Sequence, residues 1–270
     1  MRKLAIIGGG KMGEALVAGL VHAGWAEPGE IIVAEIHAAR RDALAETYGI
    51  AVTGDTIEAV KDAPTVLLAV KPQDLDGVLD EMAGVVTDSQ LIMSIAAGIP
   101  TALLERRLGS TVPVVRAMPN TPALLREGAT AIAAGSHATD EHMAHADEIL
   151  SAVSRIVHLP ERYLDAVTGV SGTGPAYVFF LAEALIEAAV GVGLPRDVAT
   201  ELTVQTLLGS ARMLRETGRH PVELREEVTS PGGTTVAAMS VLEHRGVRSA
   251  FLDAVRAATD RSRQLAEGHD

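Results

Sequence analysis

Short strand-like apolar runs alternate with helical segments along the first 160 residues. This alternation is typical of a parallel sheet with helices on both faces. Short runs rich in β-branched and other apolar residues predict strands at Leu4–Ile7, Ile31–Ala34, Val66–Val70, Leu91–Ile95, Val112–Arg116 and Thr130–Ala133. Amphipathic helical segments lie between several of these runs, at Met12–Ala23, Ala38–Tyr48 and Asp74–Ala83. We therefore expect a doubly wound α/β domain with a mostly parallel sheet over residues 1–160.

The strand pattern ends after Pro160, and residues 161–270 are typical of helices separated by glycine and proline. The expected helices cover residues 161–168, 175–193, 195–216, 221–227, 232–244 and 247–266. Pro175–Leu194 is long and apolar enough to span a membrane, but Glu183 and Glu187 within it would be costly in lipid. We expect instead no membrane partner and an all-α second domain, in which this helix is buried inside the domain or between subunits.

Composition narrows the classes of function. The formal net charge of −12 disfavours a nucleic-acid partner, because phosphate binding depends on clustered lysine and arginine. The chain contains no cysteine, which excludes disulfides, thiol nucleophiles and cysteine-ligated metals. The apolar run Leu4–Ile7 is too short for the core of a signal peptide, so we expect a cytoplasmic protein.

A glycine-rich sequence follows the first predicted strand and opens the first predicted helix. It matches the pattern G-x-G-x-x-G of dinucleotide-binding Rossmann domains, and the flanking strand and helix make the match specific. Gly8 would allow a tight turn, Gly10 the close approach of a pyrophosphate, and Gly13 the packing of the helix on the strand. The cofactor-binding residues predicted here are Gly8, Gly9, Gly10, Lys11, Met12 and Gly13.

Glu35 ends the second predicted strand, where a carboxylate can accept hydrogen bonds from the adenosine ribose and repels a 2′-phosphate. It favours NADH over NADPH. His37, Arg40 and Arg41 lie just downstream, and an arginine there could hold NADPH instead, so both cofactors stay open. Ligands of such sheets bind outside the carboxyl ends of the strands, which adds to the predicted cofactor site Ala69, Val70, Lys71, Pro72, Ala96, Ala97 and Asn120.

The loop Thr229–Thr235 interrupts helical sequence with two adjacent glycines and several hydroxyl side chains. Its backbone N–H groups and the N-terminus of the following helix could cradle an anion such as a carboxylate. All four lysines lie within the first 71 residues, so the second half lacks the lysine that would serve as acid or base in an alcohol–ketone conversion. A C=N substrate needs no such group, because its nitrogen is readily protonated before hydride arrives. The loop therefore favours a small carboxylate-bearing imine.

Four segments resemble pyrroline-5-carboxylate reductase, in the same order and along nearly the whole chain: Ala69–Pro72, Arg116–Pro122, Val170–Tyr177 and Ser230–Thr235. The resemblance implies hydride transfer from NADH or NADPH to the C=N carbon of 1-pyrroline-5-carboxylate, giving L-proline in the last step of proline biosynthesis. It also implies a Rossmann domain at residues 1–160 and a helical substrate-binding and dimerisation domain at 161–270. Homodimers of this family are commonly assembled further into decamers, so we expect a homodimer or a decamer.

Residue roles follow from the resemblance by position. The substrate-binding residues it implies are Glu161, Ser230, Gly233, Thr234 and Thr235. Ser230, Gly233 and Thr234 would hold the carboxylate in a loop at the dimer interface. Thr235, the predicted catalytic residue, would bond the ring nitrogen. Glu35 departs from the small polar residue of many relatives, which puts their usual preference for NADPH in doubt.

Two alternative functions remain open from the sequence. The chain could reduce another small imine or a 2-oxo acid on the same scaffold. It could also be a catalytically inactive NAD(P)-binding regulator, although the hydroxyls at positions 230, 234 and 235 argue against that. His137, His142 and His145 lie in or near one helix, and His142 and His145 share a face at i, i+3. A solvated helix face explains them more simply than a metal, so we expect no metal site.

Overall fold

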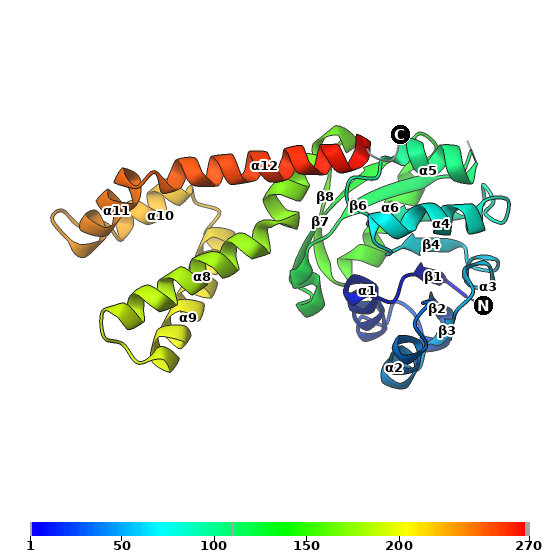
Figure 1. The fold of residues 1–270 in the computed structure, drawn as a ribbon, viewed down its shortest axis with the longest axis horizontal. Coiled ribbons are helices and arrows are strands. Elements are labelled where there is room, and N and C mark those ends of the chain that lie inside the picture. The colour runs from blue at the N-terminus through cyan, green and yellow to red at the C-terminus, as the bar shows by residue number, and fades with distance from the viewer. Residues whose placement is uncertain (1, 110, 268–270) are drawn as a thin grey trace. The chain divides into compact units, whose positions relative to one another are not determined.

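The structure is a computed structural model that describes residues 2–109 and 111–267, and it divides into two compact units (Figure 1). The first unit comprises residues 1–173 together with residues 256–270. The second unit comprises residues 174–255. The chain therefore leaves the first unit after Thr173 and rejoins it at Arg256.

One eight-stranded sheet forms the centre of the first unit, in the order β3-β2-β1-β4-β5-β6-β7-β8. Its strands are β1 (Leu4–Ile7), β2 (Ile31–Ala34), β3 (Ala51–Thr53), β4 (Thr65–Leu68), β5 (Leu91–Ser94), β6 (Val114–Met118), β7 (Gly128–Ala134) and β8 (Ser154–His158). Neighbouring strands are parallel except β6 and β7. The chain builds outward from β1 on one side and then from β4 on the other, so the switch point lies between these two strands. The predicted doubly wound, mostly parallel sheet is confirmed.

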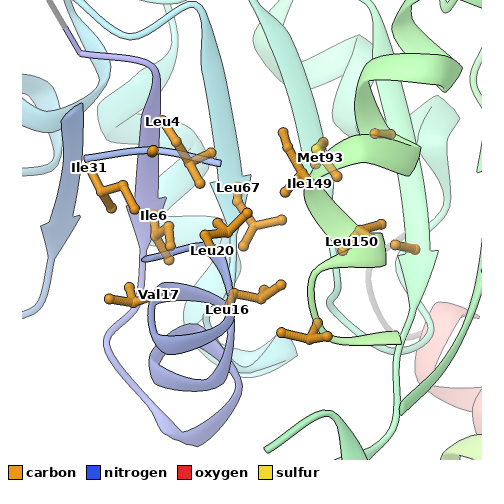
Figure 2. Close-up of a cluster of buried hydrophobic side chains, with 14 of the residues drawn as sticks. Leu4, Ile6, Leu16, Val17, Leu20, Ile31, Leu67, Met93, Ile149 and Leu150 are labelled. Atoms are coloured by element: carbon orange, nitrogen blue, oxygen red, sulfur yellow. The ribbon is translucent and has the colours of Figure 1, made fainter. Parts of the chain in front are cut away.

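Helices cover both faces of the sheet, because successive strand residues point to opposite sides and are apolar on both. In β1, Leu4 and Ile6 belong to one buried cluster, and Ala5 and Ile7 belong to the other. The first cluster packs against α1 (Lys11–His22), α2 (Ala38–Tyr48) and α6 (Asp140–Ser151). The second packs against α3 (Thr56–Val60), α4 (Pro72–Met82) and α5 (Thr101–Leu108). Figure 2 shows side chains of the first cluster, among them those of α1 beside those of β1.

The sequence pattern misses two strands. β3 has only three residues, and β8 is an edge strand in which Arg155 and His158 are exposed. Neither strand carries the continuous apolar run that marks a strand buried on both faces. The strand predicted to begin at Val112 begins at Val114 instead, because Pro113 has no N–H to donate to a neighbouring strand.

The segment after Pro160 is not the single regular helix predicted for residues 161–168. It consists of a 3₁₀ turn (Glu161–Tyr163), the short helix α7 (Leu164–Val167) and a π-helical turn (Thr168–Gly172). The hydroxyls of Thr168, Ser171 and Thr173 donate to backbone carbonyls four or five residues earlier, at 2.9–3.2 Å. These bonds help satisfy the carbonyls of the wide turn. By packing this segment belongs to the first unit, whereas the domain boundary between residues 160 and 161 stays a prediction.

The second unit is helical. It contains α8 (Gly174–Gly191), α9 (Arg196–Thr217), α10 (Pro221–Glu227), α11 (Thr234–His244) and the first part of α12 (Val247–Glu267). α8 and α9 pack against each other, and Arg196 pairs with Glu187 across them at 2.7 Å. Tyr177 of α8 meets Phe251 of α12 edge to face, with ring centroids 6.4 Å apart.

Much of the surface of α8 is apolar and exposed within the described chain, although α9 packs against one side of the helix. None of its residues is buried, and Phe179 and Phe180 are 67% and 70% exposed. The stretch Glu161–Gly191 could cross a membrane by length and composition, and none of its most apolar window is buried. The described residues of the chain therefore do not supply the predicted burial of this helix.

Candidate active site

Glycines shape the loop between β1 and α1. Gly8 has φ +107°, and a Cβ there would lie 2.8 Å from the carbonyl carbon of Ala69, so the loop packs directly on the segment after β4. A Cβ on Gly13 would overlap the carbonyl oxygen of Gly8, so the close approach of α1 to the loop requires glycine. A Cβ on Gly10, by contrast, would meet nothing within 4 Å. The loop is thus tightly packed at Gly8 and Gly13 and open at Gly10, and its contact with a pyrophosphate stays a prediction.

The N-terminus of α1 offers free N–H groups in this opening. Gly10 is the N-cap residue, and no side chain caps the helix among the described residues. The N–H of Gly8 donates to the carbonyl of Ala34, whereas the N–H groups of the first helical turn have no acceptor within the helix. These groups and the positive end of the helix dipole suit a phosphate. A cradle that a Cβ at position 10 would fill therefore fits the pyrophosphate of a dinucleotide.

Glu35 lies beside this loop, at the carboxyl end of β2. Its Oε2 accepts a hydrogen bond from Gly9 N–H at 3.0 Å, and its Oε1 accepts from His37 N–H at 2.9 Å and contacts His37 Nδ1 at 2.8 Å. Burial raises the pKa of Glu35, but the hydrogen bonds from His37 and Gly9 outweigh it, and the net pKa is lowered. Glu35 is therefore an ionised carboxylate next to the cradle.

The two arginines that could have reached a 2′-phosphate already have partners. Arg40 Nε donates to the carbonyl of Gly9 at 2.7 Å, and its Nη2 pairs with Glu14 at 2.6 Å. Arg41 Nη1 donates to the carbonyls of Glu35 and Ile36 at 2.7 and 3.0 Å. The contact between Arg40 and the glycine loop was missed by sequence reasoning, which treated this residue only as a phosphate ligand.

Further strand ends lie at the same edge of the sheet, because β4, β5 and β6 run parallel to β1. Ala69 and Val70 lie next to Gly8, and Lys71 is exposed as the N-cap of α4, which Pro72 opens. Ala96 is buried and Ala97 is half-buried after β5. The structure thus groups these predicted cofactor residues at one edge, and their contact with a cofactor stays a prediction.

Asn120, also predicted as a cofactor residue, has both ends of its amide engaged. Its Nδ2 donates to the carbonyl of Ser171 at 3.1 Å, and its Oδ1 accepts from Ala129 N–H at 2.9 Å. The side chain therefore ties the end of β6 to the π-helical turn and to β7. Its contact with a cofactor stays a prediction, and the structure gives Asn120 a positioning role in addition.

Glu161 is held by the first unit. Its carboxylate accepts from the N–H and the hydroxyl of Thr101, both at 2.7 Å, and pairs with Arg116 at 3.3 Å. Arg116 is buried in β6 and also contacts Asp165, which accepts from Ser262 of α12 at 2.8 Å. Sequence reasoning missed this network, and the signal that could have indicated it is a lone arginine in an otherwise apolar strand. Substrate binding by Glu161 stays a prediction.

The Ser230–Thr235 segment forms a turn that leads into α11. Gly233 N–H donates to the carbonyl of Ser230 at 2.9 Å, and Pro231 followed by Gly232 with φ +70° fits a type II turn. A Cβ on Gly233 would lie 2.5 Å from Ser230 Oγ. No side chain caps α11 among the described residues, and Ser230 and Thr234 are exposed. The predicted anion cradle thus has an uncapped helix N-terminus, exposed hydroxyls and glycines in a tight turn.

The histidines considered for a metal have other partners. His142 Nδ1 lies 3.0 Å from the hydroxyl of Thr139 and helps to cap α6. His145 Nε2 lies 3.0 Å from the hydroxyl of Thr65, and its ring contacts Trp25. Over residues 2–109 and 111–267 no group of three or more potential ligands could hold a metal ion.

A doubly wound sheet with a glycine cradle at its switch point and an adjacent acidic residue defines the class of dinucleotide-dependent oxidoreductases. Comparison with known families agrees. Residues 3–98 match the family described as NADP oxidoreductase, coenzyme F420-dependent. Residues 161–265 match the family described as pyrroline-5-carboxylate reductase dimerisation.

The chain belongs to the pyrroline-5-carboxylate reductase family. It is 48% identical to the pyrroline-5-carboxylate reductase of Synechocystis, with 97% of this chain and 98% of the relative covered. It is 43% identical to that of Methanosarcina acetivorans, with 98% of each covered. A solved pyrroline-5-carboxylate reductase from Coxiella burnetii has a TM-score of 0.92 and 38% identity, with 98% of each chain covered. The predicted family and enzyme class are confirmed.

A second solved structure bears on the cofactor. Pyrroline carboxylate reductase from Plasmodium falciparum, with NADP bound, has a TM-score of 0.90 and 28% identity, with 98% of each chain covered. A nicotinamide dinucleotide is therefore the cofactor class of this chain, and the matched dimerisation family indicates a homo-oligomer.

Proposed function

We propose that this chain reduces 1-pyrroline-5-carboxylate to L-proline, the last step of proline biosynthesis, with hydride from NADH or NADPH. The observation that carries the choice of substrate is the turn Ser230–Gly233, which leads into the uncapped N-terminus of α11. A carboxylate suits that N-terminus, because free N–H groups and the helix dipole both favour an anion. The imine is inferred from relatives that are named pyrroline-5-carboxylate reductase. The turn explains how the carboxylate of such a substrate would be bound.

In this proposal, different residues of the turn bind different groups of the substrate. Ser230, Gly233 and Thr234 hold the carboxylate, and Thr235 places its hydroxyl on the ring nitrogen. When bound, the nicotinamide supplies the hydride, so the chain needs to orient an imine carbon toward it rather than provide a strong base. The absence of lysine beyond residue 71 agrees with a site that orients the imine and provides no lysine as a base. Glu161 supports the substrate side through its contacts with Thr101 and Arg116.

We further propose NADH as the preferred cofactor. Glu35 is an ionised carboxylate at the end of β2, and a 2′-phosphate placed there would be repelled. Arg40 and Arg41, which could have neutralised such a phosphate, donate to backbone carbonyls. The remaining cofactor contacts come from Gly8 to Gly13 and from the ends of β4, β5 and β6.

We propose that the chain assembles in the cytoplasm as a homodimer, or as a decamer built from such dimers. Support comes from α8, whose apolar side chains are exposed in one chain and would be covered by a second copy. The substrate turn belongs to the same unit as α8. We therefore propose that the substrate site is completed on dimerisation.

Paired steady-state kinetics test the proposal. Oxidation of NADH and of NADPH is followed by the loss of the reduced nicotinamide absorbance at about 340 nm on addition of 1-pyrroline-5-carboxylate. We expect turnover with both cofactors and a higher kcat/KM with NADH. A protein without activity on either cofactor would rule out the assignment, and a preference for NADPH would rule out the role given to Glu35.

A further inference from the structure

The peptide groups of Gly9 are held from both sides. Its N–H donates to Glu35 Oε2 at 3.0 Å, and its carbonyl accepts from Arg40 Nε at 2.7 Å. Gly9 is buried, and it immediately precedes Gly10, whose missing side chain opens the cradle. The orientation of the cradle is therefore set by two charged side chains outside the loop.

Arg40 is itself fixed in place. Its Nη2 pairs with Glu14 of α1 at 2.6 Å, and the hydroxyl of Tyr48 donates to the other oxygen of Glu14 at 3.2 Å. The hydrogen bond from Arg40 is the largest influence on Glu14, whose pKa is lowered, so the carboxylate stays ionised at neutral pH. The side chain of Arg40 is only 29% exposed. One planar group thus joins α2, α1 and the glycine loop.

We propose that Arg40 is a positioning residue for the cofactor: by holding the Gly9 carbonyl it keeps the N–H groups of Gly10 to Met12 aimed at the pyrophosphate, and it acts equally on NADH and NADPH. This inference rests on the proposed placement of the dinucleotide at the glycine loop. NADH and NADPH share the pyrophosphate and differ only at the 2′ position. A residue that works through the loop therefore affects both, whereas a residue that binds the 2′-phosphate affects NADPH alone.

The experiment compares Arg40→Met and Arg40→Lys with the wild-type chain. Arg107→Met is the matched control, because Arg107 also pairs with carboxylates, those of Asp76 and Asp80, and donates to a backbone carbonyl, and its side chain is 33% exposed. Dissociation constants for NADH and NADPH are measured by isothermal titration calorimetry on the full-length protein without substrate. Tm and kcat at saturating cofactor are measured on the same samples.

For Arg40→Met we expect the Kd of NADH and that of NADPH to rise by the same factor, about tenfold, which is the loss of one charge-assisted hydrogen bond. We expect kcat at saturating cofactor to stay within about twofold, since the reacting groups are untouched. Arg40→Lys keeps the charge but not the fork of donors, so its Kd values should fall between those of the wild type and Arg40→Met. Arg107→Met should change Tm without changing either Kd.

Each other result counts against the proposal. A loss confined to NADPH would make Arg40 a ligand of the 2′-phosphate. A lower Tm with both Kd values unchanged would leave Arg40 a purely structural role. If Arg40→Met does not fold, Arg40→Lys alone tests the proposal. An equal rise in its Kd for NADH and for NADPH would support the proposal, and unchanged Kd values would overturn it. Failure of the wild-type chain to bind either cofactor would instead refute the proposed cofactor site itself.

Discussion

Replacing Gly10 with alanine adds one methyl group at the open side of the glycine loop. Gly10 has φ −66° and ψ −174°, which alanine adopts without strain, and its Cβ would meet no heavy atom within 4 Å. Alanine is a poorer N-cap than glycine, so the expected cost to the free energy of unfolding is about 0.5 kcal/mol. For a chain of this size that lowers Tm by roughly 1–2 °C.

Cofactor binding should suffer far more than folding. The new methyl group stands where we propose that the pyrophosphate approaches the first turn of α1, and it would hold the phosphate away from those N–H groups. Losing two charge-assisted hydrogen bonds, each worth about 1.5–3 kcal/mol, raises Kd by at least about 100-fold. Because the pyrophosphate is common to both cofactors, the loss should be equal for NADH and NADPH.

The assay is calorimetric titration of Gly10→Ala with each cofactor, beside its thermal unfolding. Gly77→Ala is the matched control, since Gly77 is exposed in α4 and a Cβ there also meets nothing within 4 Å. That control should gain about 0.5–1 kcal/mol from the better helix propensity of alanine and bind both cofactors normally. A folded Gly10→Ala protein with wild-type Kd values would refute the reading of this loop as the pyrophosphate site.

Three further expectations concern other parts of the chain. Gly13→Ala forces α1 away from Gly8 by roughly 1 Å and should cost about 1–3 kcal/mol, seen as a lower Tm together with weaker cofactor binding; an unchanged Tm would contradict the packing described. The pKa of Glu14 is lowered by Arg40, so the stability that this ion pair gives is present above the unfolded-state pKa and is lost as pH falls through the lower folded-state value. The Tm difference between wild type and Glu14→Gln should thus be constant near neutrality and shrink below about pH 4.3, and a constant difference down to acid pH would exclude this origin. Thr235→Ala should lower kcat by at least about tenfold with cofactor Kd unchanged, and Thr235→Ser should restore most of the activity; equal losses in kcat and cofactor Kd would refute the role of the hydroxyl.

Local backbone geometry explains why the glycine loop could be predicted. The roles of Gly8, Gly10 and Gly13 depend on φ, on open space and on helix packing, and all three follow from a strand, a turn and a helix in immediate succession. Strands buried on both faces were predicted equally well, because their apolar runs are continuous. β3 and β8 lack such runs, one through its length and the other through its place at the edge of the sheet.

Side-chain partners across the sheet could not be predicted in the same way. Arg40 and Gly9 are 31 residues apart, and Glu161 and Thr101 are 60 residues apart, so only the fold brings them together. A long polar side chain near a predicted site is a candidate ligand from sequence alone. The structure shows that Arg40 and Asn120 also hold the backbone around that site, which sequence proximity does not reveal.

The second unit shows the other limit of sequence reasoning. A helix that is apolar nearly all round must be covered, but the pattern does not say by what. Within the described chain α8 has no buried residue, and burying a side chain such as Phe179 or Phe180 stabilises a complex by about 1.5–3 kcal/mol. Several such side chains supply enough free energy for a stable dimer even after the entropic cost of association. The matched dimerisation family spans this helix and the Ser230–Thr235 turn alike, so in the proposed dimer the association that covers α8 also fixes the unit that carries the proposed substrate site.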